Sequence, residues 1–306
     1  MRKPAPFLSV LLLVLTIPVF AFPQIGETGG EILPGLIEDV KRLEKMTNIA
    51  RLESIKAMLS ERDIPYEIEL FSQDKNKNYP RSEGVNVIIT MGSQKKEIIL
   101  GAHWDAPWID KNVLSGGIID NGCSVIILMR IAEELQKMNL NHRIRIVFFD
   151  MEEIGLLGSK AYVAKHKNDN IQFMINLDVC GAGNTLIFGN RKKAEGNPIF
   201  TALKNACVEE DINFVEFPRF YACDEIPFQS LGIKGIMISL APEIDAHLLW
   251  LKLNGPEGGG SIDSYWPTKY IKSIHSKDDT SEMADPVGMT FCFRAVLETV
   301  IRLDRN

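Results

Sequence analysis

Continuous runs of apolar residues alternate along the chain with segments whose apolar residues recur every three or four positions. The first pattern predicts buried strands, and the second predicts helices that pack on one side. The predicted strands are 66–71, 85–91, 97–101, 143–150, 171–179, 186–188, 214–217 and 235–240, and the predicted helices are 37–60, 124–138, 155–165, 198–209 and 286–302. This alternation favours an α/β fold in which helices cover both faces of a mixed, mostly parallel central sheet, a three-layer αβα sandwich.

Residues 241–272 interrupt this order because they show no clear apolar period. The segment contains three consecutive glycines, Gly258 to Gly260, and the pair Trp266-Pro267 shortly before His275. Long irregular insertions in compact domains are commonly functional. We interpret the segment as a loop or lid over a site, and a peripheral elaboration is the alternative.

The amino end has the pattern of an export signal. Arg2 and Lys3 precede an apolar run at 7–20, and the residues up to Ala21 form a small-x-small cleavage pattern. Residues 1–21 are therefore a predicted signal peptide, followed by one domain at 22–306 that is secreted or periplasmic. An uncleaved anchor is the alternative, although the run is shorter than the roughly 20 residues of a membrane span. After cleavage no stable membrane association is expected.

The composition of the 306 residues excludes some classes of partner and site. A hydrophobic content of 45% suits one large globular domain, and a net charge of −6 without a basic patch gives no reason to expect a nucleic acid partner. The five cysteines cannot all pair with one another, and they lack the close spacing of a thiolate zinc site. One disulfide, involving Cys223, stays open, while Cys123 and Cys292 lie in apolar helical stretches and are expected to be buried thiols.

Histidines and acidic residues stand where several predicted strands end. His103 and Asp105 follow one apolar strand, and alternation places both side chains on the same side. An imidazole that binds a metal usually donates its second N–H to a carboxylate or carbonyl, so His103 suits a ligand and Asp105 its partner. A single His-x-Asp is nevertheless common at ordinary strand ends.

Further acidic residues make this pair more informative. Asp120 stands between a glycine-rich turn and a helix, where its ordinary role is an N-cap. Glu152 and Glu153 follow the strand at 143–150, and Asp178 ends the strand at 171–179. Open α/β sheets place their sites at such carboxyl ends. One of two adjacent carboxylates can bind a metal while the other acts as a base. His247 is not expected to be a ligand, because no second ligand-like residue shares its spacing, and His142 and His166 are expected to be solvated residues at helix ends.

The order of short motifs resembles the M28 family of co-catalytic zinc aminopeptidases. The motifs are His-x-Asp, Gly-x-x-Asp-Asn, Phe-Phe-Asp-x-Glu-Glu-x-Gly-Leu-Leu-Gly-Ser, Asn-Leu-Asp and His-x-x-x-Asp, spread over residues 38–303. The resemblance implies a zinc-exopeptidase fold of the phosphorylase/hydrolase type, two Zn²⁺ ions per chain and peptide substrates with a free amino terminus. It also implies the roles of the site residues: His103 and Asp178 hold one zinc, Glu153 and His275 hold the other, Asp120 bridges the two, and Glu152 is the general base. Asp105 keeps the orienting role argued above. By the same resemblance Tyr221 steadies the oxyanion, and ordinary packing in the core is the alternative for this residue.

The chain departs from the family pattern at two places. Ile119 stands where the family often has a second aspartate, and Cys223-Asp224-Glu225 replaces Ser-Asp-His, which affects recognition of the substrate end more than metal binding. The alternative function is a glutaminyl cyclase with a single zinc, on a related fold. Such relatives have a longer segment after the paired glutamates and often a tryptophan before the final histidine. Here Ile154 follows Glu153 and Ile274 precedes His275, which favours the peptidase. A non-catalytic relative would normally lack ligands or the base, and none is missing.

Overall fold

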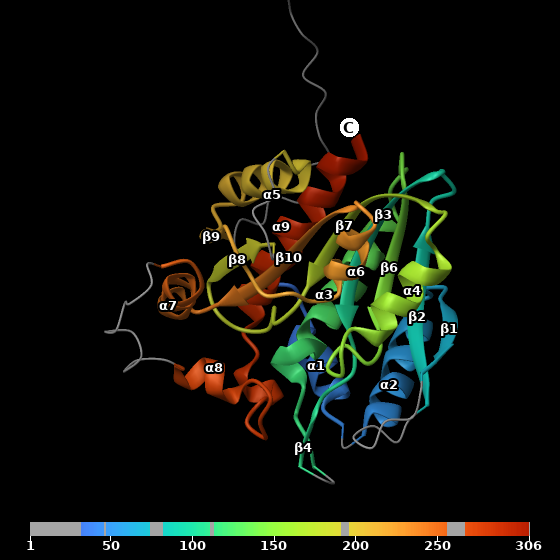
Figure 1. Ribbon diagram of the computed structural model, residues 1–306. Coiled ribbons are helices and arrows are strands. Elements are labelled where there is room, and N and C mark those ends of the chain that lie inside the picture. The colour runs from blue at the N-terminus through green and yellow to red at the C-terminus, as the bar shows by residue number, and fades with distance from the viewer. Residues whose placement is uncertain are drawn as a thin grey trace, which may run out of the picture. The chain divides into compact units, whose positions relative to one another are not determined.

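An eight-stranded mixed sheet forms the centre of the computed structural model, which describes residues 32–45, 47–73, 82–110, 113–190, 196–255 and 267–305 (Figure 1). The order across the sheet is β1-β2-β6-β3-β7-β10-β8-β9. The strands are β1 (Glu67–Ser72), β2 (Glu83–Met91), β3 (Lys96–His103), β6 (Arg143–Phe149), β7 (Asn170–Leu177), β8 (Thr185–Gly189), β9 (Phe214–Phe217) and β10 (Lys234–Ala241). The four middle strands β6, β3, β7 and β10 are parallel, whereas β2 and β8 join them antiparallel.

Helices cover both faces of the sheet. One face carries α1 (Leu36–Leu43), α2 (Asn48–Glu61), α3 (Cys123–Leu135), α5 (Pro198–Glu209) and α9 (Pro286–Arg305), and the other carries α4 (Leu157–Lys165) and α6 (Glu225–Ser230) (Figure 1). Alternation along β3 sends Leu100 to the core of the first face and Ile99 to the core of the second. The predicted three-layer αβα architecture is confirmed.

Two predicted elements differ from the structure. The helix expected at 37–60 is split between α1 and α2, because Thr47 adopts an extended backbone and its side chain accepts a hydrogen bond from the amide of Ala50 at 3.1 Å. The segment 241–272 is less irregular than expected, since it contains α7 (Glu243–Asn254) and α8 (Lys269–Ser273). Residues 256–266, with the three glycines and Trp266, lie outside the described residues, as does the predicted signal peptide at 1–21.

Short elements complete the fold near the carboxyl ends of the parallel strands. They are the two-stranded sheet of β4 (Trp108–Asp110) and β5 (Val113–Leu114), the π-helical turn η1 (Ile118–Gly122) and the 3-10 turn η2 (Ser281–Met283). All five cysteines are buried and free, which confirms Cys123 and Cys292 as buried thiols and leaves Cys223 unpaired. Within the described ranges, no helix is both long enough and apolar enough to cross a membrane.

Candidate metal centre

The site residues gather where the parallel strands β3, β6 and β7 end. His103 is the last residue of β3, Glu152 and Glu153 follow β6, and Asp178 follows β7. In the parallel pairing of β3 with β6, His103 lies opposite Phe149, the last residue of β6. Residues far apart in sequence therefore meet at one edge of the sheet.

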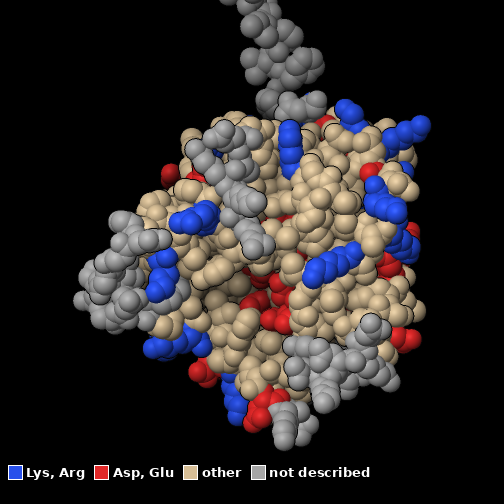
Figure 2. All heavy atoms as spheres, in the orientation of Figure 1, with Lys and Arg blue, Asp and Glu red and all other residues tan. Residues whose placement is uncertain are grey.

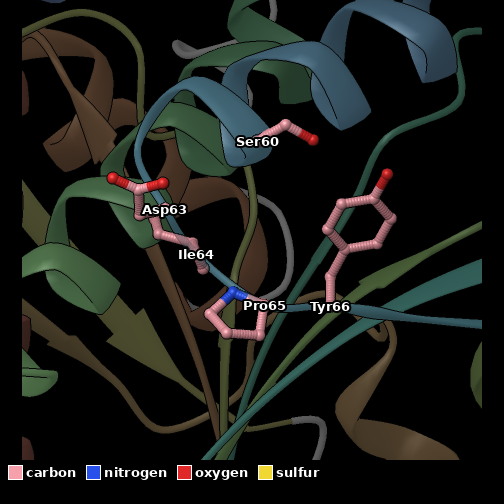
Figure 3. A pocket seen from close by; sticks show the side chains of 5 residues that line it. All are labelled: Ser60, Asp63, Ile64, Pro65 and Tyr66. Atoms are coloured by element: carbon pink, nitrogen blue, oxygen red, sulfur yellow. The ribbon is translucent and has the colours of Figure 1, made fainter.

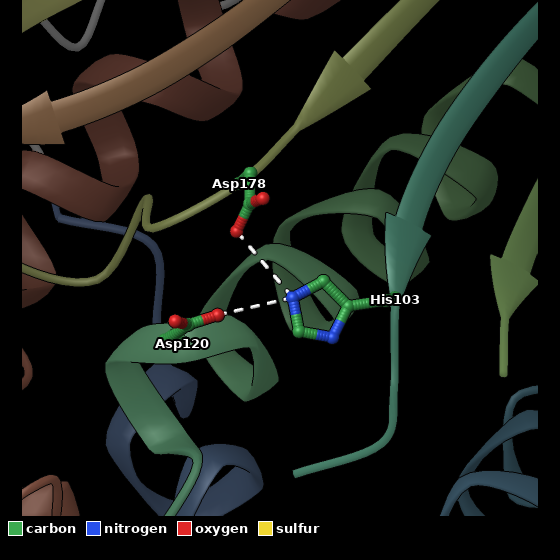
Figure 4. A group of neighbouring side chains, drawn as sticks. All are labelled: His103, Asp120 and Asp178. Atoms are coloured by element: carbon green, nitrogen blue, oxygen red, sulfur yellow. Dashed lines mark hydrogen bonds and ion pairs between the residues drawn. The ribbon is translucent and has the colours of Figure 1, made fainter. Parts of the chain in front are cut away.

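One group of side chains surrounds His103 (Figure 4). Its Nε2 atom lies 3.0 Å from Oδ1 of Asp120 and 3.5 Å from Oδ1 of Asp178. All three side chains are buried, and their ligand atoms lie close enough together to surround one cation.

A second group lies on the other side of Asp120. Nε2 of His275 is 2.9 Å from Oδ2 of Asp120 and 3.3 Å from Oε2 of Glu153. The two oxygens of Asp120 thus face two different histidines. A carboxylate placed in this way can bridge two cations about 3.5 to 4 Å apart.

The donor atoms of both groups suit zinc, which accepts histidine nitrogen and carboxylate oxygen. Oε1 of Glu153 is buried and has no hydrogen-bond partner within the described structure, and Oδ1 of Asp178 is buried facing Nε2 of His103 at 3.5 Å. Buried carboxylates without compensating partners are costly, and a bound cation removes that cost. The residues present therefore fit a metal ion at each group.

Charge interactions within the centre shift the pKa values of the histidines and of the shared aspartate in opposite directions. Burial disfavours charge on His103, but hydrogen bonds to Asp105, Asp120 and Asp178 raise its pKa well above the usual range. Hydrogen bonds to Asp120 and Glu153 raise the pKa of His275 to about 11. Burial opposes ionisation of Asp120, yet the bonds from both histidines hold its pKa below the ordinary value.

The adjacent glutamates lie among other acids and histidines. Figure 2 shows red Asp and Glu atoms gathered in a hollow on one face of the molecule. Burial, with the charges of Asp178, Asp224 and Glu153, raises the pKa of Glu152 to about 10. Burial also raises the pKa of Glu153, to about 7, although its hydrogen bond with His275 opposes the shift. A cation bound among these carboxylates would favour their ionised forms.

Asp105 contacts both the histidine and the glutamate loop. Nδ1 of His103 lies 3.1 Å from the main-chain oxygen of Asp105 and 3.6 Å from its Oδ1 atom. The same Oδ1 accepts a hydrogen bond from the amide of Glu152 at 3.1 Å. Asp105 thus fixes the ring of His103 and also the main chain of Glu152.

Tyr221 is the one predicted site residue without a described contact to this cluster. Its ring lies 5.8 Å from the ring of Phe220, and its side chain is half exposed. Partial burial raises the pKa of its phenol, so the hydroxyl stays protonated as a donor.

Two residues that hold the Asp120 loop were not predicted as site residues. Buried Arg51 on α2 donates to the carbonyls of Gly116 and Gly117, at 2.5 and 2.8 Å. Asp279 accepts hydrogen bonds from three successive amides, those of residues 118, 119 and 120. Asp279 was visible in the sequence as the aspartate of His-x-x-x-Asp, whereas Arg51 had no local signal because it belongs to an ordinary helical pattern.

One hollow away from these groups is of a different kind. A hollow of about 390 Å³ after α2 is lined by Ser60, Asp63, Ile64, Pro65 and Tyr66 (Figure 3). It contains none of the clustered histidines and acids.

Similarity to curated proteins covers the part of the chain that carries the site. The probable leucine aminopeptidase 2 of Trichophyton verrucosum is 28% identical over 232 residues, which are 70% of this chain and 43% of that protein. Aminopeptidase Y of Saccharomyces cerevisiae is 28% identical over 175 residues, 53% of this chain and 31% of that protein. The chain thus spans less than half the length of these relatives.

Solved structures share the fold at low sequence identity. Glutaminyl cyclase of Porphyromonas gingivalis matches with a TM-score of 0.67 and 20% identity, covering 88% of this chain and 97% of that chain. The zinc aminopeptidase BSAP of Bacillus subtilis matches with a TM-score of 0.60 and 17% identity, covering 74% and 51%. These likenesses support the zinc-exopeptidase type of fold.

The resemblance seen in the motifs is confirmed at the level of the family. The profile of peptidase family M28 matches residues 86–300, well over half of the chain. The matched range contains His103, Asp120, Glu153, Asp178 and His275, which are the residues of the two groups described above. The chain therefore belongs to peptidase family M28.

Proposed function

We propose that this protein is a zinc-dependent aminopeptidase whose site holds two ions. The observation that carries the proposal is Asp120, whose two oxygens lie 3.0 and 2.9 Å from two different histidines. His103 and Asp178 are the proposed ligands of one ion, Glu153 and His275 those of the other, and Asp120 bridges them. Such a zinc pair, when bound, polarises a peptide carbonyl and lowers the pKa of a shared water.

Glu152 is the proposed general base. It stands next to the ligand Glu153, and the carboxylate of Asp105 holds its amide, so its carboxylate is positioned without being assigned to an ion. It would take the proton of the attacking water and return a proton to the leaving amine. Tyr221 is the proposed donor to the oxyanion, because its phenol is half exposed and lies three residues before Asp224.

The proposed substrates are peptides with a free amino terminus. The hollow is lined by carboxylates, and an α-ammonium group is the part of a peptide that complements them electrostatically. Asp120 and Glu152 are the acids proposed to face that group. Acetylation removes the positive charge, so an acetylated peptide should not be cleaved.

Export is part of the proposal, with a mature chain that begins near Phe22 after removal of residues 1–21. Amino-terminal sequencing of secreted or periplasmic protein tests it. Recovery of the full-length chain only in membranes would favour the uncleaved anchor.

The alternative activity is cyclisation of amino-terminal glutamine by a single zinc, and one experiment separates the two reactions. Zinc-loaded protein is incubated with a Gln-initiated peptide, a Leu-initiated peptide and their acetylated forms, and the products are identified by mass spectrometry. Residue-by-residue shortening of both free peptides supports the aminopeptidase. Loss of ammonia from the Gln peptide alone, with no shortening, would establish the cyclase instead.

A further inference from the structure

A third group of potential ligand atoms lies beside the proposed zinc pair. It consists of the thiol of Cys223 and the carboxylates of Glu152 and Asp178, whose ligand atoms all lie within 4.8 Å of one another. We propose that these three residues bind an additional soft divalent cation, excess Zn²⁺ or Cd²⁺, and that this ion inhibits the enzyme by occupying Glu152. The inhibitory effect rests on the function proposed above, whereas the binding itself does not.

The position is built from buried groups. Cys223 immediately precedes Asp224 and α6, is only 7% exposed, and directs its thiol at the Asp178 carboxylate. Asp178 is 5% exposed, and its Oδ1 atom faces Nε2 of His103 at 3.5 Å. Because a carboxylate has two oxygens, Asp178 can serve the ion of His103 and a further ion at Cys223.

The thiol decides which cation is preferred. Thiolate is a soft ligand that favours zinc and cadmium over magnesium and calcium, which prefer oxygen. A cysteine thiol has an ordinary pKa of about 8.5 and is mostly protonated near neutral pH. On binding, the S–H bond breaks, a sulfur–metal bond forms and the proton leaves to solvent; no electron is transferred.

The surrounding acids compensate the charge of an additional ion. Glu225 is completely buried, one of its oxygens accepts from the amide of Cys223 at 3.5 Å, and the other has no partner among the described residues. This excess of carboxylates next to the thiol favours a cation there.

The consequence for the reaction follows from Glu152. A carboxylate whose lone pairs bind a cation no longer accepts a proton from water. Activity should therefore rise until two zinc ions are bound and fall again as a third, weaker ion binds. Magnesium should not produce the fall.

The test titrates protein loaded with two zinc ions with Cd²⁺ and records three quantities: the ultraviolet thiolate-to-cadmium charge-transfer absorption, the metal content and the peptidase activity. The two proposed zinc groups contain no cysteine, so the absorption reports only on thiolate binding. We expect one cadmium-thiolate per chain and at least a tenfold loss of activity. Cys223→Ser should show neither the absorption nor the loss, measured against its own two-zinc activity.

Cys180→Ser is the matched control, because Cys180 is also buried near Asp178 but its sulfur contacts the main-chain oxygen of Ile238, at 3.4 Å. This variant should behave like the unchanged protein. If Cys223→Ser does not fold, protection of Cys223 from alkylation by Cd²⁺ in the unchanged protein, measured by peptide mass spectrometry, gives the same answer.

Absence of the absorption, or its persistence in Cys223→Ser, would overturn the site. Cadmium-thiolate formation without loss of activity would overturn the inhibitory role. If two-zinc protein cleaves no peptide, the proposed function fails, and the absorption and protection measurements still decide whether Cys223 binds the ion.

Discussion

Glu152 and Glu153 are neighbours in the chain, yet their surroundings differ. Oε2 of Glu153 lies 3.3 Å from Nε2 of His275, whereas the amide of Glu152 donates a hydrogen bond to Asp105. The pKa of Glu152 is raised to about 10, and that of Glu153 to about 7. Both glutamates belong to groups of potential ligand atoms, but of the two only Glu153 shares a group with His275. Their position at a strand end predicted that the two could have different roles, and the family resemblance implied that Glu153 would meet His275. The structure brings those two side chains together.

Glu152→Gln should keep both zinc ions and lose about 10² to 10⁴ in turnover, the usual scale of general acid/base catalysis. An amide has nearly the same shape but cannot accept the proton. Metal analysis and steady-state kinetics measure the two effects. Glu153→Gln is the matched variant and should lose metal. If Glu152→Gln lost metal and Glu153→Gln kept it, the two roles would be exchanged.

His275→Ala should reduce the zinc content from two ions to about one and remove most activity, because His275 supplies the only nitrogen donor of its group. His247→Ala is the control, since His247 is an exposed residue of α7 whose described ion pair is with Glu243. Equal zinc content in both variants would contradict the assignment of His275.

At the scale of elements, the turn η1 depends on partners from distant parts of the chain. Arg51 of α2 holds the carbonyls of Gly116 and Gly117, and Asp279, four residues after His275, holds the amides of η1. The loop that carries Asp120 is therefore held from both sides. Outer partners of this kind commonly determine metal affinity.

Asp279→Asn should weaken zinc binding by about 10- to 100-fold, since outer-shell partners have effects of this size. The amide group cannot accept all three main-chain hydrogen bonds, and a buried amide left without a partner costs about 1–3 kcal/mol of unfolding free energy. Competition with a chromophoric chelator measures the affinity, and thermal unfolding measures the stability. Exposed Asp278→Asn should change neither quantity. Unchanged zinc affinity in Asp279→Asn would remove its positioning role.

The apolar pattern predicted the sheet and the strand ends well, and the errors have physical causes. The strand predicted at 214–217 agrees with the structure to the residue. The helix predicted at 198–209 does so as well, because Pro198 and the capping Asn197 mark its start. The break before α2 was missed because Thr47 acts as a local cap inside a continuing apolar period. The helix α7 was missed because its buried residues Ala246 and Leu249 pack on a separate small core with Ile187, which no local period reveals.

The prediction that His142 and His166 face solvent is also wrong, because their partners come from other elements. His142 is buried against Asp304 of α9. His166, at the end of α4, stacks on Tyr162 and lies 3.0 Å from Oε2 of Glu69 on β1 and 2.8 Å from Oδ2 of Asp169. The hydrogen bond to Glu69 raises the pKa of His166 above its ordinary value. This contact joins the edge strand β1 to α4.

His166→Gln should therefore destabilise the protein in a pH-dependent way. A raised folded-state pKa means that the histidine's charge contributes stability fully below the unfolded pKa of about 6.5, and that this contribution disappears as pH rises through the folded pKa. The difference in unfolding free energy between the two proteins should be larger at pH 5.5 than at alkaline pH. Denaturant unfolding across this range measures it, with exposed His247→Gln as the control. A difference that grows with pH would contradict the argument.

At the scale of the whole molecule, buried acidic residues are concentrated in one region. The chain carries a net charge of −6, and several of its acids are buried together at one edge of the sheet rather than spread over the surface. Such a concentration of buried carboxylates destabilises the folded protein without a cation and makes it responsive to one. Folding and metal binding should therefore be strongly linked.

Zinc should raise the melting temperature of the purified protein substantially. An ion that binds only the folded state at about a thousand times its Kd adds about 4.1 kcal/mol, and a domain of this size gains about 2–4 °C per kcal/mol, so each ion contributes on the order of 10 °C. Thermal unfolding of chelator-treated protein, with and without excess free zinc, measures the shift. His275→Ala should retain about half of it, and Asp120→Asn, which weakens both groups, should retain less. Magnesium should have a smaller effect, because the histidine donors favour zinc. If Asp120→Asn gained as much from zinc as the unchanged protein, the stabilising ions would bind elsewhere, and the shared carboxylate would not be the link between metal binding and folding.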